Sequence, residues 1–384
     1  MISIAKPCLG NEEIRAARKV ILSGWVSQGP RVKEFENRFL SYTGSKYACA
    51  VSSCTAGLHL ALLAVGVRPG DRVVTVSHSF IATANSIRHT GAEPVFVDID
   101  PETFNISPAC LEMCLNKNRS RVAAILVVHQ MGMPCDLGNI LRLARRFKLP
   151  VIEDAACAIG SEVSVNGGKT WERIGKPHGD IACFSFHPRK VITTGDGGML
   201  TANNNNYDKK FRLLRHQGMS ISDRDRHCSK KVIFEKYPAT GYNYRMTDIQ
   251  AAIGIEQLKK IKRIVKKRRQ IARLYGSELK GVKWLKLPVE PFYCRSNWQS
   301  YPVRILKKNA PLERNRLMQR LLDAGISTRR GIMNAHQEKA YALSGTDVRL
   351  KNSELARDEV MLLPIFYDMR ESQVKKVAKE IRNA

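Results

Sequence analysis

The sequence predicts an α/β protein in which a large domain with a mainly parallel central sheet precedes a smaller C-terminal α+β domain. From residue 47 to 200, short apolar runs alternate with amphipathic segments. Continuous apolar strands separated by helices are typical of a parallel sheet that is covered on both faces. After Gly276 the pattern changes to short strands and a helix. We therefore assign residues 1–255 to the large domain and 256–384 to the small domain.

The elements of the large domain follow from hydrophobic periodicity. Buried strands form short apolar runs, and amphipathic helices carry an apolar residue every three or four positions. The polar and basic stretch 219–240 is expected to form a long loop. Strands are expected at 47–52, 72–75, 93–97, 122–127, 150–152 and 181–186, and helices at 56–64, 81–90, 108–116 and 137–147.

A further helix is expected to begin after Thr247, because threonine is a favoured N-cap residue. In the small domain we expect strands at 282–285 and 299–305 and a helix at 312–323. The helix after Thr247 has one apolar face, formed by Leu258, Ile261, Val265, Ala272 and Tyr275.

Composition excludes several classes of protein. The 384 residues are 43% hydrophobic and 26% charged, which is too apolar for a disordered chain. No apolar run reaches the roughly 18–20 residues that a membrane-spanning helix needs. The N-terminus lacks the pattern of a secretion signal, so we expect a cytoplasmic protein. The ten cysteines are scattered without paired spacing, which predicts reduced thiols and no metal site.

The net charge of +28 would attract polyanions such as nucleic acid or phosphorylated substrates. The densest basic run, at 259–269, lies on the helix whose other face is apolar. It contains no aromatic residues that could stack on bases, and no DNA-binding motif surrounds it. The run is therefore interpreted as a solvated helix face, and nucleic acid is not the expected partner.

Three features carry chemistry. The first is Lys190, which follows the strand at 181–186 and precedes the glycine-rich turn 195–198. A lysine at a strand end can form a Schiff base with an aldehyde. The ordinary pKa of lysine is about 10.4, so we expect burial and a nearby cofactor to lower the pKa of Lys190. Alone, this pattern also suits a solvated loop lysine.

The second feature is Asp154 at the end of an apolar strand, where a carboxylate could hold the ring nitrogen of a pyridine cofactor. An aspartate there could equally cap a helix.

The third feature is the stretch 51–60, in which a strand turns through small polar residues into a helix, and helix N-termini bind phosphate. In this order, the three features are the parts of a pyridoxal phosphate site.

The sequence resembles the DegT/DnrJ/EryC1/StrS family of PLP-dependent nucleotide-sugar aminotransferases. The resemblance implies fold type I, the aspartate aminotransferase-like architecture, and pyridoxal 5′-phosphate as cofactor. It covers nearly the whole chain. The motifs that carry it lie at 24–30, 34–36, 77–85, 94–100, 153–156, 185–198 and 241–246.

The resemblance implies a role for each matching residue. Lys190 would bind the cofactor covalently and transfer protons, Asp154 would pair with the ring nitrogen, and Phe80 would stack on the ring. Thr55, Ser185 and the backbone around Cys54 would bind the phosphate. Asn243 would reach the cofactor of a neighbouring subunit, which implies a homodimer with shared active sites. Substrate contacts are expected from His187, Arg245, Arg329, Arg330 and His336.

Two positions depart from the common family pattern. Cys54 stands where glycine is usual, so the phosphate turn must accommodate a side chain. Cys157 stands where glutamine is frequent near the cofactor ring, which leaves that contact open. His187 is interpreted mainly as a loop residue that supports its neighbours, with a catalytic acid as the alternative.

The resulting hypothesis is transamination from an amino acid, expected to be L-glutamate, to a keto sugar of a nucleoside diphosphate, with a slight preference for 4-keto sugars. The pathway would be amino-sugar or cell-surface polysaccharide biosynthesis, such as that of lipopolysaccharide O-antigen. Two alternatives stay open. One is a PLP-dependent sugar dehydratase, although that branch carries histidine where this chain has Lys190. The other is a basic regulatory protein that binds nucleic acid.

Overall fold

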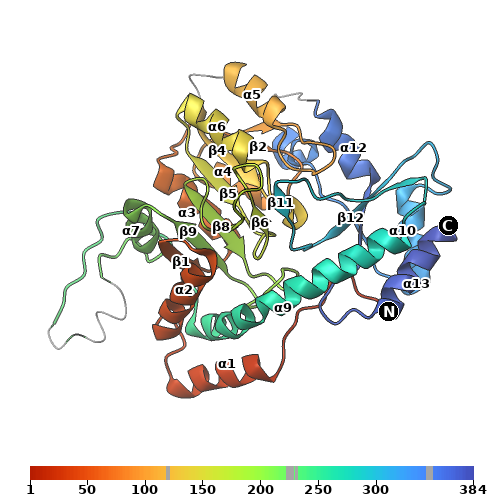
Figure 1. Ribbon diagram of the computed structural model, residues 1–384. Coiled ribbons are helices and arrows are strands. Elements are labelled where there is room, and N and C mark those ends of the chain that lie inside the picture. The colour runs from red at the N-terminus through yellow and green to blue at the C-terminus, as the bar shows by residue number, and fades with distance from the viewer. Residues whose placement is uncertain (118–121, 222–228, 230–231, 343–348) are drawn as a thin grey trace.

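The centre of the protein is a seven-stranded sheet in the computed structural model, which describes residues 1–117, 122–221, 229, 232–342 and 349–384 (Figure 1). Within these residues the strand order is β1-β9-β8-β5-β4-β2-β3. Strand β9 runs antiparallel to both of its neighbours, and the pairs from β8 to β3 are parallel. The strands are β1 (Tyr47–Val51), β2 (Arg72–Val76), β3 (Glu93–Val97), β4 (Val122–Val128), β5 (Val151–Asp154), β8 (Ile181–Ser185) and β9 (Gly198–Ala202).

The structure confirms the predicted strands and helices of this domain, with small shifts at their ends. Strand β5 begins one residue later than expected and extends to Asp154. The expected helices are α3 (Cys54–Val65), α4 (Ala82–His89), α5 (Pro108–Lys117) and α6 (Leu137–Phe147). Helices that the sequence analysis did not place are α1 (Asn11–Ser23), α2 (Pro30–Thr43) and α7 (Asn205–Leu214). The described parts of 219–240 contain no helix or strand, and residues 222–228 and 230–231 of that predicted loop lie outside the described residues.

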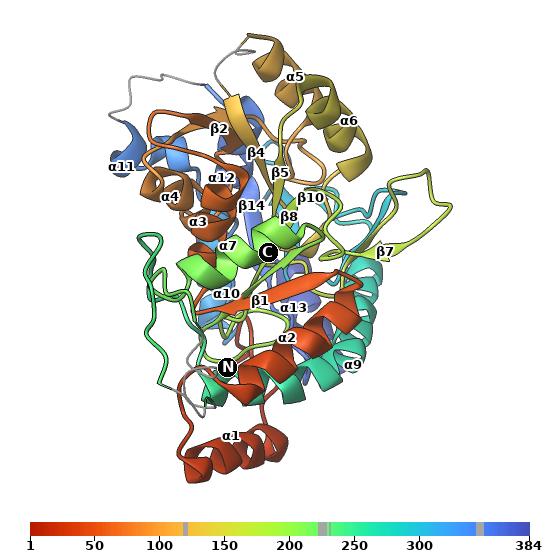
Figure 2. The same ribbon diagram turned by 90° about the vertical axis from the view of Figure 1, so that its left-hand side faces the viewer.

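The long helix α9 (Asp248–Glu278) connects the two halves of the chain. Thr247 caps it as predicted, since its hydroxyl accepts a hydrogen bond from the Gln250 amide at 3.2 Å. The predicted apolar face is buried along its whole length. Helix α9 packs against α1 and α2 (Figure 2). It also packs against α13 (Glu371–Arg382). The boundary predicted between residues 255 and 256 thus falls inside one continuous helix.

A second sheet, of four strands within the described residues, forms the core of the C-terminal part in the order β10-β12-β14-β13. The strand predicted at 282–285 begins only at Leu285, because the Leu285 amide first closes a turn onto the Val282 carbonyl. Ile2 pairs with Ile326, so the N-terminal residues also lie beside this sheet. The elements are β10 (Leu285–Lys286), β12 (Tyr301–Ile305), β13 (Arg329–Arg330), β14 (Val360–Leu363), α10 (Arg314–Asp323), α11 (Lys339–Ala342), α12 (Lys351–Glu359) and η2 (Ala335–Gln337).

A small sheet joins the two halves of the chain beside the larger sheets. Strand β11 (Cys294–Arg295) pairs with β6 (Glu162–Val163), which pairs with β7 (Glu172–Arg173). The turn that follows β11 is thereby brought next to the central sheet. None of the helices formed by the described residues has the length and apolarity to cross a bilayer.

The carboxylate of Asp248 joins helix α2 to helix α9. It accepts hydrogen bonds from the amides of Gly29, Arg31 and Val32 at 2.8, 3.0 and 2.9 Å. These amides lie at the N-terminus of α2, where they have no partner within the helix. Asp248 therefore caps a helix from more than 200 residues away in sequence.

We expect Asp248→Ala to lower the free energy of unfolding by about 1–3 kcal/mol, because the α2 amides lose their acceptor in a buried setting. Urea denaturation followed by circular dichroism measures the effect. Asp368→Ala serves as the control, since its ion pair with Lys6 is exposed and contributes less than about 1 kcal/mol. Equal stability of the two variants would contradict the proposed cap.

Candidate active site

Asp154 lies at the carboxyl end of β5, and its carboxylate is buried. Thr83 donates its hydroxyl to Oδ2 at 2.8 Å, and the Ala156 amide donates to Oδ1 at 3.1 Å. Burial raises the pKa of Asp154, and these two hydrogen bonds only partly oppose it. The preceding residue, Glu153, points to the other face and binds His129 at 3.0 Å. Of the two adjacent acids, Asp154 is thus the one that contacts Thr83 and the backbone after β5.

Lys190 lies in the turn that follows β8, where its amide donates to the His187 carbonyl at 2.8 Å. Its Nζ donates to Cys157 Sγ at 3.1 Å. Burial lowers the pKa of the Lys190 ammonium, but Cys157 and Asp154 outweigh burial and hold that pKa above its ordinary value. Burial thus acts in the direction that the sequence analysis expected, and the further lowering expected from a bound cofactor stays a prediction.

The N-terminus of α3 forms the predicted phosphate turn. The Ser53 hydroxyl caps the helix by accepting from the Ala56 amide at 3.1 Å. Cys54 is buried, and its thiol donates to the Cys183 carbonyl at 3.6 Å. The side chain that replaces the usual glycine is thereby accommodated against β8. Thr55 is partly exposed, and Ser185 ends the adjoining strand, so two hydroxyl groups lie in this region with the positive end of the helix.

Phe80 presents an aromatic side chain that is 61% exposed. Its carbonyl accepts from the Thr83 amide at 3.0 Å, and Thr83 in turn holds Asp154. An exposed aromatic ring, a buried carboxylate and a lysine thus belong to one connected group of residues. This arrangement fits a flat, cationic ring that carries an aldehyde, which is the chemistry of pyridoxal phosphate.

The segment 241–246 lies beside the phosphate turn, because the Ser52 amide donates to the Tyr244 carbonyl at 2.8 Å. Asn243 is exposed on the single chain and pairs through its backbone with His216. Arg245 Nη1 lies 3.0 Å from His216 Nδ1. Both predicted residues therefore lie near the phosphate region.

The candidate substrate residues differ in their surroundings. His187 accepts from the Arg189 amide at 3.2 Å, which supports its interpretation as a residue of the lysine turn. His336 reaches the edge of the central sheet, where its Nδ1 lies 2.6 Å from Ser77 Oγ. Arg329 and Arg330 are exposed on strand β13 of the second sheet.

Sequence analysis missed three residues that hold the site together, namely Thr83, Asn297 and Gln299. Thr83 had a usable signal, since it lies within the motif 77–85 that carries the family resemblance, three residues after Phe80. Asn297 donates to the Cys157 carbonyl at 2.8 Å, and Gln299 donates to the Arg189 carbonyl at 3.1 Å. These two residues are more than 100 positions from their partners, and no local pattern indicated them.

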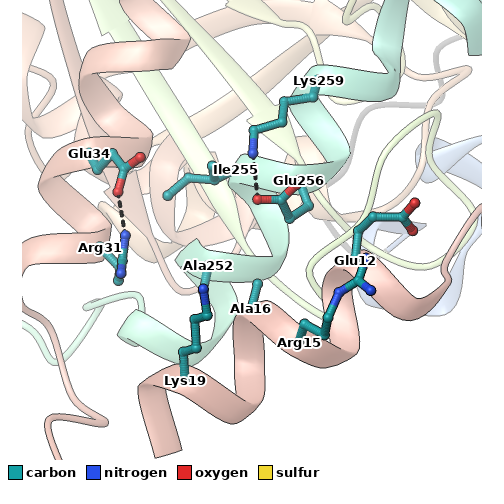
Figure 3. Close-up of a pocket in the computed structure, with 10 residues that line it drawn as sticks. All are labelled: Glu12, Arg15, Ala16, Lys19, Arg31, Glu34, Ala252, Ile255, Glu256 and Lys259. Carbon is teal, nitrogen blue, oxygen red and sulfur yellow. Dashed lines mark hydrogen bonds and ion pairs between the residues drawn. The ribbon is translucent and has the colours of Figure 1, made fainter. Parts of the chain in front are cut away.

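A separate hollow of about 300 Å³ lies between α1, α2 and α9 (Figure 3). It contains basic and acidic side chains, and two of its ion pairs, Arg31–Glu34 and Lys259–Glu256, are internal to it. Its lining includes none of the predicted site residues. We therefore place the functional site at the carboxyl edge of the central sheet.

Comparisons with known proteins agree with this geometry. The DegT/DnrJ/EryC1/StrS aminotransferase family matches residues 7–382. An uncharacterised protein of Methanocaldococcus jannaschii is 37% identical over 381 residues, which is 98% of this chain and 96% of that protein. The aminotransferase TlmJ of Streptoalloteichus hindustanus is 34% identical, with a TM-score of 0.89 over 100% of this chain and 98% of TlmJ.

A sugar aminotransferase described as putative, Spr1654 of Streptococcus pneumoniae, has been solved in PMP and PLP forms. The PMP form is 26% identical, with a TM-score of 0.91 over 100% of this chain and 98% of that protein. These matches confirm the predicted fold type I architecture and pyridoxal 5′-phosphate as the cofactor. The chain belongs to the DegT/DnrJ/EryC1/StrS family of aminotransferases.

Proposed function

We propose that this aminotransferase transfers an amino group from L-glutamate to the keto carbon of a sugar carried by a nucleoside diphosphate. The observation that carries the proposal is that the buried Asp154 is hydrogen-bonded to Thr83 of the segment that exposes Phe80 and also interacts electrostatically with Lys190. Two relatives support the substrate class. PseC of Helicobacter pylori acts in the biosynthesis of pseudoaminic acid, and DesI was solved with its TDP-sugar product. We favour a 4-keto sugar and a role in cell-surface polysaccharide biosynthesis, such as that of O-antigen.

The proposed roles of the residues follow from their positions. Bound pyridoxal 5′-phosphate supplies an aldehyde and an electron-accepting ring. Asp154 would hold the protonated ring nitrogen, and Phe80 would cover a face of the ring. Thr55 and Ser185 would bind the phosphate at the N-terminus of α3. Lys190 would bind the aldehyde carbon through Nζ and, once displaced by the amino donor, would move the proton of the reacting carbon.

The charge of the protein suits the proposed substrate. A nucleoside diphosphate is strongly anionic, and a net charge of +28 would increase its rate of encounter with the protein. Arg245 follows Tyr244, whose carbonyl is bound by the amide of Ser52 next to the phosphate turn, and His336 contacts Ser77, three residues before Phe80. We propose these two residues as substrate contacts, with Arg329 and Arg330 as further candidates.

The protein reconstituted with cofactor should absorb at about 420 nm. Addition of L-glutamate should remove this band and release 2-oxoglutarate. Lys190→Ala should lose both the band and turnover, because the Nζ atom that binds the aldehyde is removed. Absorption spectra and an assay for 2-oxoglutarate test both statements. Lys176→Ala is the control, since Lys176 pairs with Glu172 on another turn.

A Lys190→Ala variant that kept the band and full turnover would contradict the assignment of Lys190. Formation of a deoxygenated keto sugar without consumption of an amino donor would indicate the dehydratase instead. A panel of nucleotide-linked keto sugars then identifies the acceptor and the ring position that is aminated.

Removal of the Thr83 hydroxyl should change the pH dependence of the reaction. The hydrogen bond from Thr83 lowers the pKa of Asp154, so Thr83→Val should raise that pKa further. The carboxylate is then protonated over a wider acidic range, and the acidic limb of kcat/KM moves to higher pH. We expect a loss of about tenfold in kcat/KM near the acidic limb. Thr83→Ser, which keeps the hydroxyl, should retain the profile, and an identical shift in both variants would argue against this role.

We also propose that the active enzyme is a homodimer in which each site uses residues of both subunits. Asn243 is exposed on the single chain. The nearby segment 232–240 extends from the body beside α7 (Figure 1) and exposes the large apolar side chains of Val232 and Phe234, at 84% and 85%. Apolar side chains of this size are favoured at interfaces between subunits.

Subunit complementation tests this assembly. Lys190→Ala and Asn243→Ala should each be nearly inactive as homodimers, because each lacks a group at every site. Hybrid dimers from co-expression should have one intact site, so a random mixture should show about a quarter of the wild-type activity. Activity that stays at the sum of the two separate variants, despite dimer formation in analytical ultracentrifugation, would exclude the shared site.

A further inference from the structure

A single turn of the C-terminal part of the chain, residues 296–299, binds the backbone of two residues next to Lys190, one in space and one in sequence. Asn297 Nδ2 donates to the carbonyls of Cys157 and Ile159, each at 2.8 Å. Gln299 Nε2 donates to the Arg189 carbonyl at 3.1 Å. Cys157 is the residue that contacts Lys190 Nζ, and Arg189 directly precedes Lys190. The turn is therefore hydrogen-bonded to the two segments that surround Lys190 Nζ.

The turn has an unusual backbone. Trp298 has a φ of +52°, a left-handed conformation that residues other than glycine rarely adopt. Internal hydrogen bonds support it, since the Gln299 amide donates to Asn297 Oδ1 at 2.8 Å and the Trp298 amide donates to Ser296 Oγ at 2.9 Å. These two hydrogen bonds use the amides of Trp298 and Gln299. The carbonyls of the same two residues accept hydrogen bonds from partners outside the turn.

Arg268 of helix α9 supplies these partners. Its Nη1 donates to the Trp298 carbonyl at 2.9 Å and to the Gln299 carbonyl at 3.1 Å. The Arg268 side chain is buried, and no ion pair involves it within the part of the chain that the structure describes. Its Nε has no hydrogen-bond partner there, and burial lowers the pKa of the guanidinium to about 10.

A buried cation without a carboxylate is costly, and an apolar side chain of similar size would pack at lower cost. The position therefore has a use beyond packing. The neighbouring Arg269 provides a contrast, because it is partly exposed, lies 3.6 Å from Glu162 and binds the carbonyls of Arg295 and Ser296. Arg268 thus binds the end of the turn that carries Gln299, whereas Arg269 binds its first residue.

We propose that Arg268 is a positioning residue for Lys190, acting through the turn 296–299 and the side chain of Gln299. The guanidinium holds the carbonyls of residues 298 and 299 on helix α9. Gln299 and Asn297 then hold the lysine turn and the Cys157 loop at the distance at which Nζ meets its reaction partner. This inference rests on the proposed role of Lys190.

The test measures covalent capture of pyridoxal 5′-phosphate by the purified apoenzyme. Stopped-flow absorbance at about 420 nm gives the rate at which Lys190 Nζ bonds to the aldehyde carbon. Fluorescence quenching gives the affinity for the cofactor in the Lys190→Ala background. We expect Arg268→Met to slow capture by about tenfold or more, because misplacement of a reacting atom is costly. Gln299→Met should slow it in the same direction. Arg268→Lys should recover part of the rate, and Lys266→Met, at an exposed position of the same helix, should leave it within about twofold of wild type.

In the Lys190→Ala background, Arg268→Met should change cofactor affinity by less than about twofold, since the residue acts through the lysine. Equal losses of affinity with and without Lys190 would overturn the proposal and indicate a general structural role. Capture at the wild-type rate by both Arg268→Met and Gln299→Met would also overturn it. If Arg268→Met does not fold, Gln299→Met still provides the test, because Gln299 is only partly buried. Absence of the band in the wild-type protein would instead refute the role of Lys190.

Discussion

The burial of one carboxylate, that of Asp154, is the constraint on which the active site depends. A buried carboxylate costs several kcal/mol, roughly, unless it is paired and hydrogen-bonded. Its donors and its charged partner come from three separate segments, the helix that carries Thr83, the backbone after β5 and the turn that carries Lys190. The order β8-β5-β4-β2 brings these segments to one edge of the sheet. The same edge is where open α/β sheets bind ligands.

The C-terminal part of the chain completes this edge in two places. The turn 296–299 binds the carbonyls of Arg189, which precedes the lysine, and of Cys157. In the segment before Phe80, His336 binds Ser77 and Asn334 binds His78. Helix α9 is continuous between the two parts and is buried along one face. A substitution in the C-terminal part of the chain can therefore alter the positions of the residues at the carboxyl edge of the central sheet.

Two cysteines show how this chain accommodates its departures from the family pattern. Cys54 turns its thiol away from the phosphate turn and onto the Cys183 carbonyl, so that the helix N-terminus stays open. Cys157 faces inward and contacts Lys190 Nζ at 3.1 Å. A thiol is smaller than the amide of glutamine and is a weaker hydrogen-bond donor. The surroundings of the lysine in this protein therefore differ from those in relatives that carry glutamine.

The sequence by itself determined the α/β class, most strand positions and the residues Lys190 and Asp154, because apolar periodicity and strand-end motifs are local signals. The strand predicted at 282–285 was displaced by a turn. The sequence also did not indicate that the Cys157 thiol, and after it Asp154, oppose the lowering of the Lys190 pKa by burial, because these residues come together only in the fold. Only the tertiary structure decided that Gln299 and Arg268 support the lysine turn. Their partners are distant in sequence, and a hydrogen bond between distant segments forms only when the fold has placed them together.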